Sequence, residues 1–270
     1  KSKGNGIIPA LQMGYSHTSG QYIHRMDADD IMPQNKLSTL YNLITSYGNG
    51  HIATGHVSYF SNQKLNAGYQ NYAKWLNQLC ENNTQWDAIF KECVIASPNW
   101  LISRSDFEQA GGFYSSIYPE DYDLVFRFFK ENLKVVSAKE ITHHWRDHEN
   151  RSSRTMEIYK DNAYFDLKWH YFKDLKLDLN RPTVIWGAGP KGKRLVKTIQ
   201  KDGHPITWVS NNPNKHGKNI YNEILESYQE IINEKNPQIL VAVGQRKAQK
   251  EIRNFLNSNN YSEGKDYFFL

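Results

Sequence analysis

The segment His24–Asp30 contains three aspartates within four positions, Asp27, Asp29 and Asp30. Carboxylates at positions i and i+2 converge where the backbone turns, and together they form a site of hard oxygen ligands that suits Mg²⁺ or Mn²⁺. A diphosphate would supply the remaining ligands, and the cation would neutralise the negative charge that grows on a leaving nucleoside diphosphate. The segment is therefore a candidate metal-diphosphate site.

One plainer interpretation of this acidic segment stays open. The segment is also compatible with a solvated acidic loop in which Asp30 caps the helix that follows Pro33. A calcium loop of the EF-hand type is disfavoured, because the glycine and glutamate spacing downstream is absent.

A second acidic group, Glu120 and Asp121, stands at the start of a predicted helix. The macrodipole of a helix keeps a carboxylate ionised at this end, which suits a general base that takes a proton from a hydroxyl nucleophile. The alternative is that both residues merely cap the helix and complement its dipole.

A basic and aromatic segment, residues 143–154, follows a predicted strand. Arg146 is suited to pair with phosphate oxygens, and His148 to contact a diphosphate or its cation. A solvated surface loop is one alternative. A zinc site made by His143, His144 and His148 is another, although adjacent histidines rarely point the same way.

The order of these segments resembles glycosyltransferase family 2, whose members have the GT-A fold and invert the transferred sugar. The resemblance covers residues 4–155 and rests on several motifs. These motifs are Ala10–Gly14, Ser19–Ile23, Met26–Asp30 with Pro33, Ser97–Arg104, Gly111–Phe113 and Pro119–Leu124.

The resemblance implies roles for individual residues. Asp27 lies near the ribose or the metal, Asp29 binds the metal, and Asp121 is the catalytic base. On the acceptor side it implies Trp100, Gly112 and Glu120, and it makes the segment with Arg146 and His148 a mobile lid over the diphosphate.

The resemblance also implies partners and a setting. The cofactor is Mn²⁺ or Mg²⁺, the donor is a nucleotide-diphosphate sugar with UDP-sugars favoured, and the acceptor is a saccharide or a lipid-linked sugar. Bacterial surface-polysaccharide synthesis is the usual setting, which indicates the cytoplasm, at the inner face of the membrane. Two further βα units that carry the nucleotide-base pocket in the family have no counterpart, so we expect the chain to be a fragment.

Regular elements must position these residues. Apolar spacing predicts helices and short strands alternately along the chain. In the first region we expect helices over 7–16, 33–47, 69–82 and 121–131 and strands over 21–26, 51–60, 99–103 and 134–138. In the second we expect strands over 183–186, 206–210, 239–243 and 266–270, with helices over 193–201 and 245–257 between them.

This pattern predicts an α/β protein of two domains. We expect a GT-A domain over residues 1–175, with a mixed, mostly parallel sheet, and a small Rossmann-like α/β domain over 181–270. Arg181-Pro182 marks the junction, because the residue before proline is pushed away from helix.

The second domain contains a glycine turn, Gly187, Gly189 and Gly192, between a strand and a helix. Its G-x-G-x-x-G spacing fits a nucleotide held at a helix N-terminus. A dinucleotide site also needs an acidic residue at the end of the second strand, where this chain has Ser210–Pro213. We therefore favour a structural or regulatory module. A non-catalytic nucleotide- or sugar-binding module and an NAD-dependent sugar-modifying enzyme remain as alternatives.

Composition limits the class of protein. The 270 residues are 39% hydrophobic and 23% charged, enough apolar material for packed cores and unlike a disordered chain. The net charge of +5 suits anionic substrates or brief contact with an anionic membrane, and it is too small to indicate nucleic acid. Two cysteines, Cys80 and Cys93, make neither a disulfide framework nor a zinc site and fit a reducing compartment.

Overall fold

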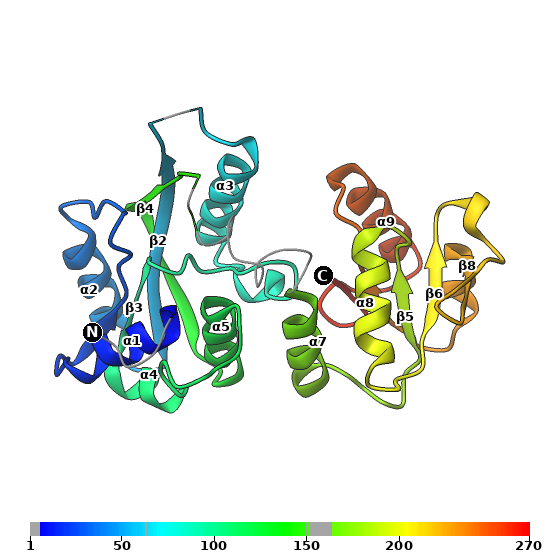
Figure 1. Ribbon diagram of the computed structural model, residues 1–270, viewed down its shortest axis with the longest axis horizontal. Coiled ribbons are helices and arrows are strands. Elements are labelled where there is room, and N and C mark those ends of the chain that lie inside the picture. The colour runs from blue at the N-terminus through cyan, green and yellow to red at the C-terminus, as the bar shows by residue number, and fades with distance from the viewer. Residues whose placement is uncertain (1–5, 63, 150, 152–163) are drawn as a thin grey trace. The chain divides into compact units, whose positions relative to one another are not determined.

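The computed structural model describes residues 6–62, 64–149, 151 and 164–270. The chain divides into two compact units, each with its own sheet (Figure 1). Unit 1 comprises residues 1–89 and 93–160, and unit 2 comprises residues 90–92 and 161–270.

Unit 1 is a mixed α/β unit. In chain order its elements are α1 (Ile7–Ser16), β1 (Tyr22–His24), α2 (Lys36–Tyr47), β2 (His51–Phe60), α3 (Ala67–Asn82), the 3-10 helix η1 (Trp86–Ala88), β3 (Trp100–Ser103), α4 (Arg104–Gln109), α5 (Glu120–Lys130) and β4 (Lys134–Arg146). The apolar spacing places α2 on the sheet, because Leu40 and Ile44 lie one turn apart and are both buried. They pack against Ala53, Leu101 and Val136 from three strands.

The sheet of unit 1 has the strand order β1-β3-β2-β4. Strand β3 runs antiparallel to both of its neighbours, and β2 runs parallel to β4. A mixed sheet with helices fits a GT-A type domain. Our expectation of a mostly parallel sheet was wrong for the described strands of unit 1, since two of their three ladders are antiparallel. Periodicity predicts that a strand exists but carries no information on its direction.

Strand β4 is much longer than the predicted strand over 134–138 and continues to Arg146. It pairs with β2 along its length, but the register shifts around His56, where β4 contains extra residues. Gly55 permits the close approach of the two strands, because a Cβ at this position would lie 2.6 Å from Thr142 Oγ1. Bulges of this kind bend a strand and re-aim its side chains.

Unit 2 contains a parallel sheet between helices. Its elements are α7 (Tyr164–Leu175), β5 (Thr183–Trp186), α8 (Pro190–Gln200), β6 (Thr207–Ser210), η3 (Pro213–Lys215), β7 (Asn219–Ile220), β8 (Glu223–Ser227), η4 (Tyr228–Asn233), β9 (Gln238–Val241), α9 (Arg246–Ser258) and β10 (Tyr267–Phe269). The strand order is β10-β9-β5-β6-β8-β7, and every ladder except the one between β7 and β8 is parallel. Its strands bury Val184, Trp186 and Val241 in one apolar core.

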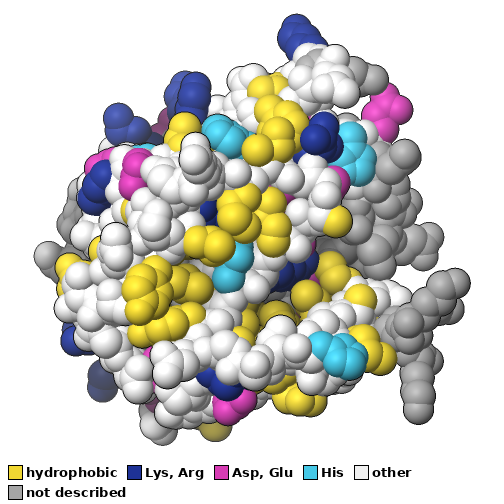
Figure 2. Space-filling view, turned by 90° about the vertical axis from the view of Figure 1, so that its left-hand side faces the viewer, with side chains coloured by type: hydrophobic (Ala, Val, Ile, Leu, Met, Phe, Trp, Pro, Cys, Tyr) yellow, Lys and Arg dark blue, Asp and Glu magenta, His cyan; other side chains and the backbone are white. Residues whose placement is uncertain are grey.

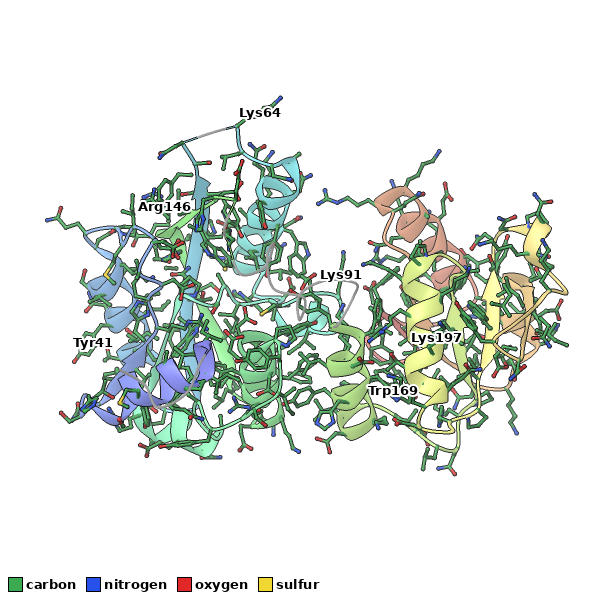
Figure 3. All side chains as sticks on the ribbon, viewed as in Figure 1. Tyr41, Lys64, Lys91, Arg146, Trp169 and Lys197 are labelled. Carbon is green, nitrogen blue, oxygen red and sulfur yellow. The ribbon has the colours of Figure 1, made fainter. Side chains whose placement is uncertain are left out.

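We expected the first domain to end at residue 175. In the structure, helix α7 already groups with unit 2. Its polar side chains explain this grouping. Asp166 accepts hydrogen bonds from Thr198 and Arg194, and the indole of Trp169 donates to Asp202 at 2.8 Å. Trp169 of α7 and Lys197, which lies in α8 beside Thr198, are labelled in Figure 3.

Two further observations concern surfaces. No helix among the described residues is both long enough and apolar enough to cross a bilayer. On the side of unit 1 shown in Figure 2, hydrophobic side chains form separate patches between polar ones. Exposed apolar residues of α2 and the turn before it include Ile31, Leu37 and Tyr41.

Candidate active site

The turn Asp27–Asp30 follows strand β1 and holds its three carboxylates in different environments. The Asp30 side chain is 1% exposed, whereas those of Asp27 and Asp29 are 31% and 49% exposed. Asp30 accepts hydrogen bonds from the His143 ring at 2.9 Å and from the backbone N–H of Arg146 at 2.8 Å. The alternative in which Asp30 caps the following helix is therefore wrong. That helix begins at Lys36 after Asn35, with no side-chain cap.

Asp27 and Asp29 present the oxygens that a divalent cation needs. Asp27 Oδ1 accepts from Arg25, and Asp29 Oδ2 accepts from His148 at 2.8 Å. Among the described residues, Asp27 Oδ2 and Asp29 Oδ1 accept no hydrogen bond and stay available. The described residues contain no group of three or more potential ligands. A cation at this turn would have two carboxylate ligands, Asp27 and Asp29, and would need its other ligands from a bound molecule.

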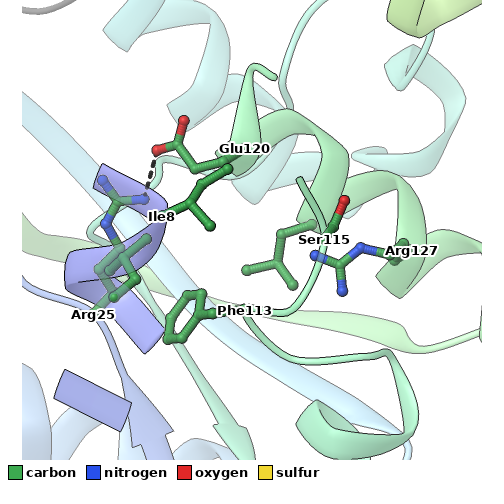
Figure 4. Close-up of a pocket in the computed structure, with 8 residues that line it drawn as sticks. Ile8, Arg25, Phe113, Ser115, Glu120 and Arg127 are labelled. Atoms are coloured by element: carbon green, nitrogen blue, oxygen red, sulfur yellow. Dashed lines mark hydrogen bonds and ion pairs between the residues drawn. The ribbon is translucent and has the colours of Figure 1, made fainter. Parts of the chain in front are cut away.

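Arg25 joins this turn to the second acidic segment. Its guanidinium donates to Asp27 Oδ1 at 3.1 Å and to Glu120 Oε1 at 3.2 Å, and both Arg25 and Glu120 are more than nine-tenths buried (Figure 4). Burial opposes the charge of Arg25, but the carboxylates of Asp27, Glu120 and Asp121 outweigh it and raise its pKa. Segments 95 positions apart in the chain therefore meet in one site.

Asp121 is the second residue of α5, and its side chain is partly exposed. Its Oδ1 accepts the backbone N–H of Tyr122 at 2.8 Å. Burial against surrounding protein, followed by the charge of Glu120, raises the pKa of Asp121 to about 7, with Arg25 acting in the opposite direction. A carboxylate with such a pKa is suited to accept a proton near neutral pH.

Arg146 and His148 both reach the aspartate turn. The Arg146 side chain (labelled in Figure 3) donates to the carbonyl oxygen of Asp29 and lies 4.5 Å from the ring of Phe60. However, Arg146 is the last residue of β4 and pairs with Phe60 of β2, so residues 143–146 belong to a strand where we expected a loop. The long partner strand β2 extends the pairing to this point. Of the rest of the expected lid, residues 150 and 152–154 lie outside the described residues.

His143 belongs to a buried group that the sequence did not reveal as a unit. Its Nδ1 lies 2.9 Å from Lys36 Nζ, which also donates to the carbonyl oxygen of Pro98 at 2.7 Å. Lys36 is fully buried, and this burial lowers its pKa to about 7 although Asp30 and Asp27 oppose the shift. Burial likewise lowers the pKa of His143.

The three histidines near this site do not assemble a zinc site. His143 and His144 are adjacent on β4, and the latter contacts the Ser58 hydroxyl at 2.6 Å while the former contacts Asp30. Successive side chains of a strand point to opposite faces, which explains the separation.

The acceptor-side residues have different surroundings. Trp100 is 2% exposed and packs on Phe107 and Phe128, so its side chain lies in the core of unit 1. Gly112 is also structural: its φ is +51°, and its carbonyl oxygen accepts from Arg127 at 2.9 Å.

Glu120 lines a small pocket of unit 1 that is partly open to solvent (Figure 4). Its lining combines apolar and charged side chains, Ile8, Leu11, Arg25, Phe113, Ser115, Glu120, Leu124 and Arg127.

The glycine turn of unit 2 is occupied largely by its own chain. A Cβ at Gly192 would lie 1.8 Å from the carbonyl oxygen of Gly187, and one at Gly187 would lie 2.8 Å from that of Ala242. A Cβ at Gly189 would meet no atom within 4 Å. At the position where a dinucleotide site needs a carboxylate, Asn211 accepts a hydrogen bond from the Trp186 indole. Gly187 and Gly192 therefore have structural roles, and Gly189 alone faces open space.

Arg25 and Lys36 were not predicted as site residues. His143 was considered only as a zinc ligand, whereas in the structure it contacts Lys36 and Asp30. One signal was present for Lys36, because it precedes Leu40 and Ile44 at four-residue spacing on the buried face of α2. A lysine on such an apolar face needs a buried partner.

Comparisons with known proteins bear on unit 1. The model of glycosyl transferase family 2 matches residues 1–111, a span that contains the Asp27–Asp30 turn and ends before Asp121. No curated protein matches the chain. Among solved structures, the chain is similar to the crystal structure of RSP, a Rex-family repressor, with 12% identity and a TM-score of 0.30 over 77% of this chain and 88% of that chain. The match over residues 1–111 supports a family 2 glycosyltransferase.

Proposed function

We propose that unit 1 is an inverting glycosyltransferase that moves a sugar from a nucleotide-diphosphate sugar, with UDP-sugars favoured, to a saccharide or a lipid-linked acceptor. The observation that carries this proposal is the bridge of Arg25 between Asp27 and Glu120. It brings a diphosphate-side carboxylate and the segment with a candidate base, Asp121, into one site. The family match supplies the reaction class.

The proton step is assigned to Asp121. Its raised pKa suits it to take the proton of an acceptor hydroxyl as that oxygen attacks the anomeric carbon. The bond from the anomeric carbon to the phosphate oxygen breaks on the opposite face, and the bonding electrons leave with the nucleoside diphosphate. Inversion at the anomeric carbon follows from this single displacement.

The donor side is assigned to the aspartate turn and to the end of β4. Asp27 and Asp29 would hold Mn²⁺ or Mg²⁺, whose charge stabilises the leaving diphosphate when the cation is bound. Arg146 and His148 already contact Asp29, so both lie where phosphate oxygens would bind beside it. We place this reaction in bacterial surface-polysaccharide synthesis, in the cytoplasm at the inner face of the membrane.

The proposal is tested by release of nucleoside diphosphate. The protein is incubated with Mn²⁺ and a panel of UDP-, GDP- and dTDP-sugars, with and without EDTA. We expect release from at least one donor, most readily a UDP-sugar, and its loss with EDTA. If the protein neither binds nor turns over any donor of the panel, the proposed function is wrong.

For unit 2 we infer a Rossmann-like module. A non-catalytic nucleotide-binding role is a second candidate, supported by the open space beside Gly189 at the start of α8. The NAD-dependent alternative is weaker, because Asn211 replaces the expected carboxylate and its side chain already bonds Trp186. Bound NAD in the purified protein would revive that alternative.

A further inference from the structure

A buried chain of hydrogen bonds crosses unit 1 behind the aspartate turn. It runs from the carbonyl oxygen of Pro98 through Lys36 and His143 to Asp30 and ends on the backbone of Arg146. Lys36, His143 and the Asp30 side chain are each at most 1% exposed. These residues come from α2, β4, the aspartate turn and the loop before β3.

The donors of this chain can be assigned from chemistry. When Lys36 is an ammonium, it has three N–H donors and no acceptor, so Nδ1 of His143 accepts its hydrogen bond. The remaining proton of a neutral imidazole is then on Nε2, which donates to Asp30 Oδ2 at 2.9 Å. The other oxygen, Oδ1, accepts the Arg146 N–H. Both oxygens of Asp30 are therefore used inside the protein, and Asp30 is not a free metal ligand.

The same turn is attached to β4 at further points. Ile31 and His144 exchange backbone hydrogen bonds of 3.0 and 3.1 Å, and the Arg146 side chain donates to the Asp29 carbonyl oxygen. A buried ammonium is not needed to pack α2, because apolar residues of similar size usually stabilise a core as well. The contacts of Lys36 and His143 instead connect the aspartate turn to the end of β4 through Asp30.

We propose that Lys36 and His143 are positioning residues. Through Asp30 they fix the Asp27–Asp30 turn against Arg146, so that the Asp29 carboxylate would face the cation and the Arg146 guanidinium would face the diphosphate that the cation binds. This inference rests on the proposed function for its consequence in catalysis. The placement of the turn itself does not depend on that function.

The test compares Lys36→Met with Lys36→Arg and with a matched control, His144→Gln. The side chain of His144 contacts Ser58 and takes no part in the buried chain. Backbone hydrogen exchange is followed over residues 27–31 and 144–148. In Lys36→Met we expect exchange of the Arg146 amide about fivefold faster, as loss of a hydrogen bond worth roughly 1 kcal/mol would give. Lys36→Arg should restore most of the protection, and His144→Gln should leave it unchanged.

Donor turnover then measures the catalytic consequence. In Lys36→Met the Mn²⁺ concentration for half-maximal turnover should rise at least about tenfold, while kcat at saturating Mn²⁺ changes less than about threefold. If Lys36→Met is not folded by circular dichroism, His143→Leu, which has no hydrogen-bonding atom for Lys36 or Asp30, is measured in the same way. Unchanged exchange in the folded variant overturns the proposal, as does a fall in kcat with an unchanged Mn²⁺ requirement. A wild-type protein that turns over no donor contradicts the proposed function instead, and the exchange result still decides the placement.

Discussion

At the scale of single residues, Asp121 carries the sharpest prediction on catalysis. A base must be ionised to accept a proton, and burial together with Glu120 raises the pKa of Asp121 to about 7. We therefore expect kcat/KM to be constant above that pKa and to fall about tenfold per pH unit below it. A pH profile from 5 to 9 at saturating Mn²⁺ measures this, and a profile that stays flat down to pH 5 would exclude Asp121 as the base.

The same pKa predicts an effect on stability. Asp121 has a higher pKa in the folded protein than its ordinary value of 3.8, so its ionisation favours the unfolded chain as pH rises towards about 7. Asp121→Asn should therefore raise the melting temperature at pH 8, and the gain should shrink as pH falls towards 4. Thermal unfolding at both pH values checks this. An equal change at pH 4 and pH 8 would contradict the raised pKa.

Residue types predicted only part of the site. Asp27, Asp29 and Asp121 stand out because carboxylates at a strand end and at a helix start are suited to metal and proton chemistry. Arg25 and Lys36 did not stand out, because their partners Glu120 and His143 lie 95 and 107 positions away. Only the folded chain brings such partners together.

At the scale of elements, the register shift between β2 and β4 places His143 beside the aspartate turn. Gly55 permits this close approach. Gly55→Ala would place a Cβ 2.6 Å from Thr142 Oγ1 and 2.8 Å from its Cγ2, and should destabilise unit 1 by roughly 1–3 kcal/mol. Thermal unfolding followed by circular dichroism measures the change.

Gly14→Ala is the matched control for this prediction. Gly14 lies within α1, and a Cβ there would meet no atom within 4 Å, so alanine should be neutral or stabilise the helix by up to about 1 kcal/mol. If Gly55→Ala is as stable as Gly14→Ala, the close approach of β2 and β4 is wrong.

The glycine turn of unit 2 gives a second pair of variants. Gly192→Ala should destabilise unit 2 by more than about 3 kcal/mol, because its Cβ would overlap the Gly187 carbonyl oxygen. Gly189→Ala should change stability by less than about 0.5 kcal/mol, since its surroundings are open and its φ is −83°. Denaturant unfolding compares the two, and equal stability of both variants would contradict a structural role for Gly192.

Periodicity predicted some elements well and others poorly. The bounds of α1 and β2 agree with those expected, because both have clear apolar patterns that end at glycine or polar residues. The end of β4 was not predicted, since His143–Arg146 has no apolar alternation and is held by its pairing with β2. The β7–β8 hairpin was also missed, because its strands are short and polar.

At the scale of the whole molecule, the sequence predicted two α/β regions, and the structure has two compact units. The position of α7 was not predictable from its own pattern, because its assignment depends on Asp166 and Trp169 meeting residues of α8 and the turn after it. The parallel sheet of unit 2 followed from alternating strands and helices. In unit 1 the antiparallel direction of β3 did not follow from this pattern.

The central claim is that two carboxylates, Asp29 and Asp121, serve different steps in one transferase site. The measurement is Mn²⁺-dependent UDP binding by calorimetry together with turnover of the best donor, for wild type, Asp29→Asn, Asp121→Asn and the control Asp87→Asn. Asp87 lies exposed in η1, away from the site.

We expect Asp29→Asn to lose Mn²⁺-dependent UDP binding and turnover. We expect Asp121→Asn to bind UDP as wild type does but to transfer at least about 100-fold more slowly. Asp87→Asn should match wild type in both measurements. Transfer at the wild-type rate by either Asp29→Asn or Asp121→Asn would contradict the account.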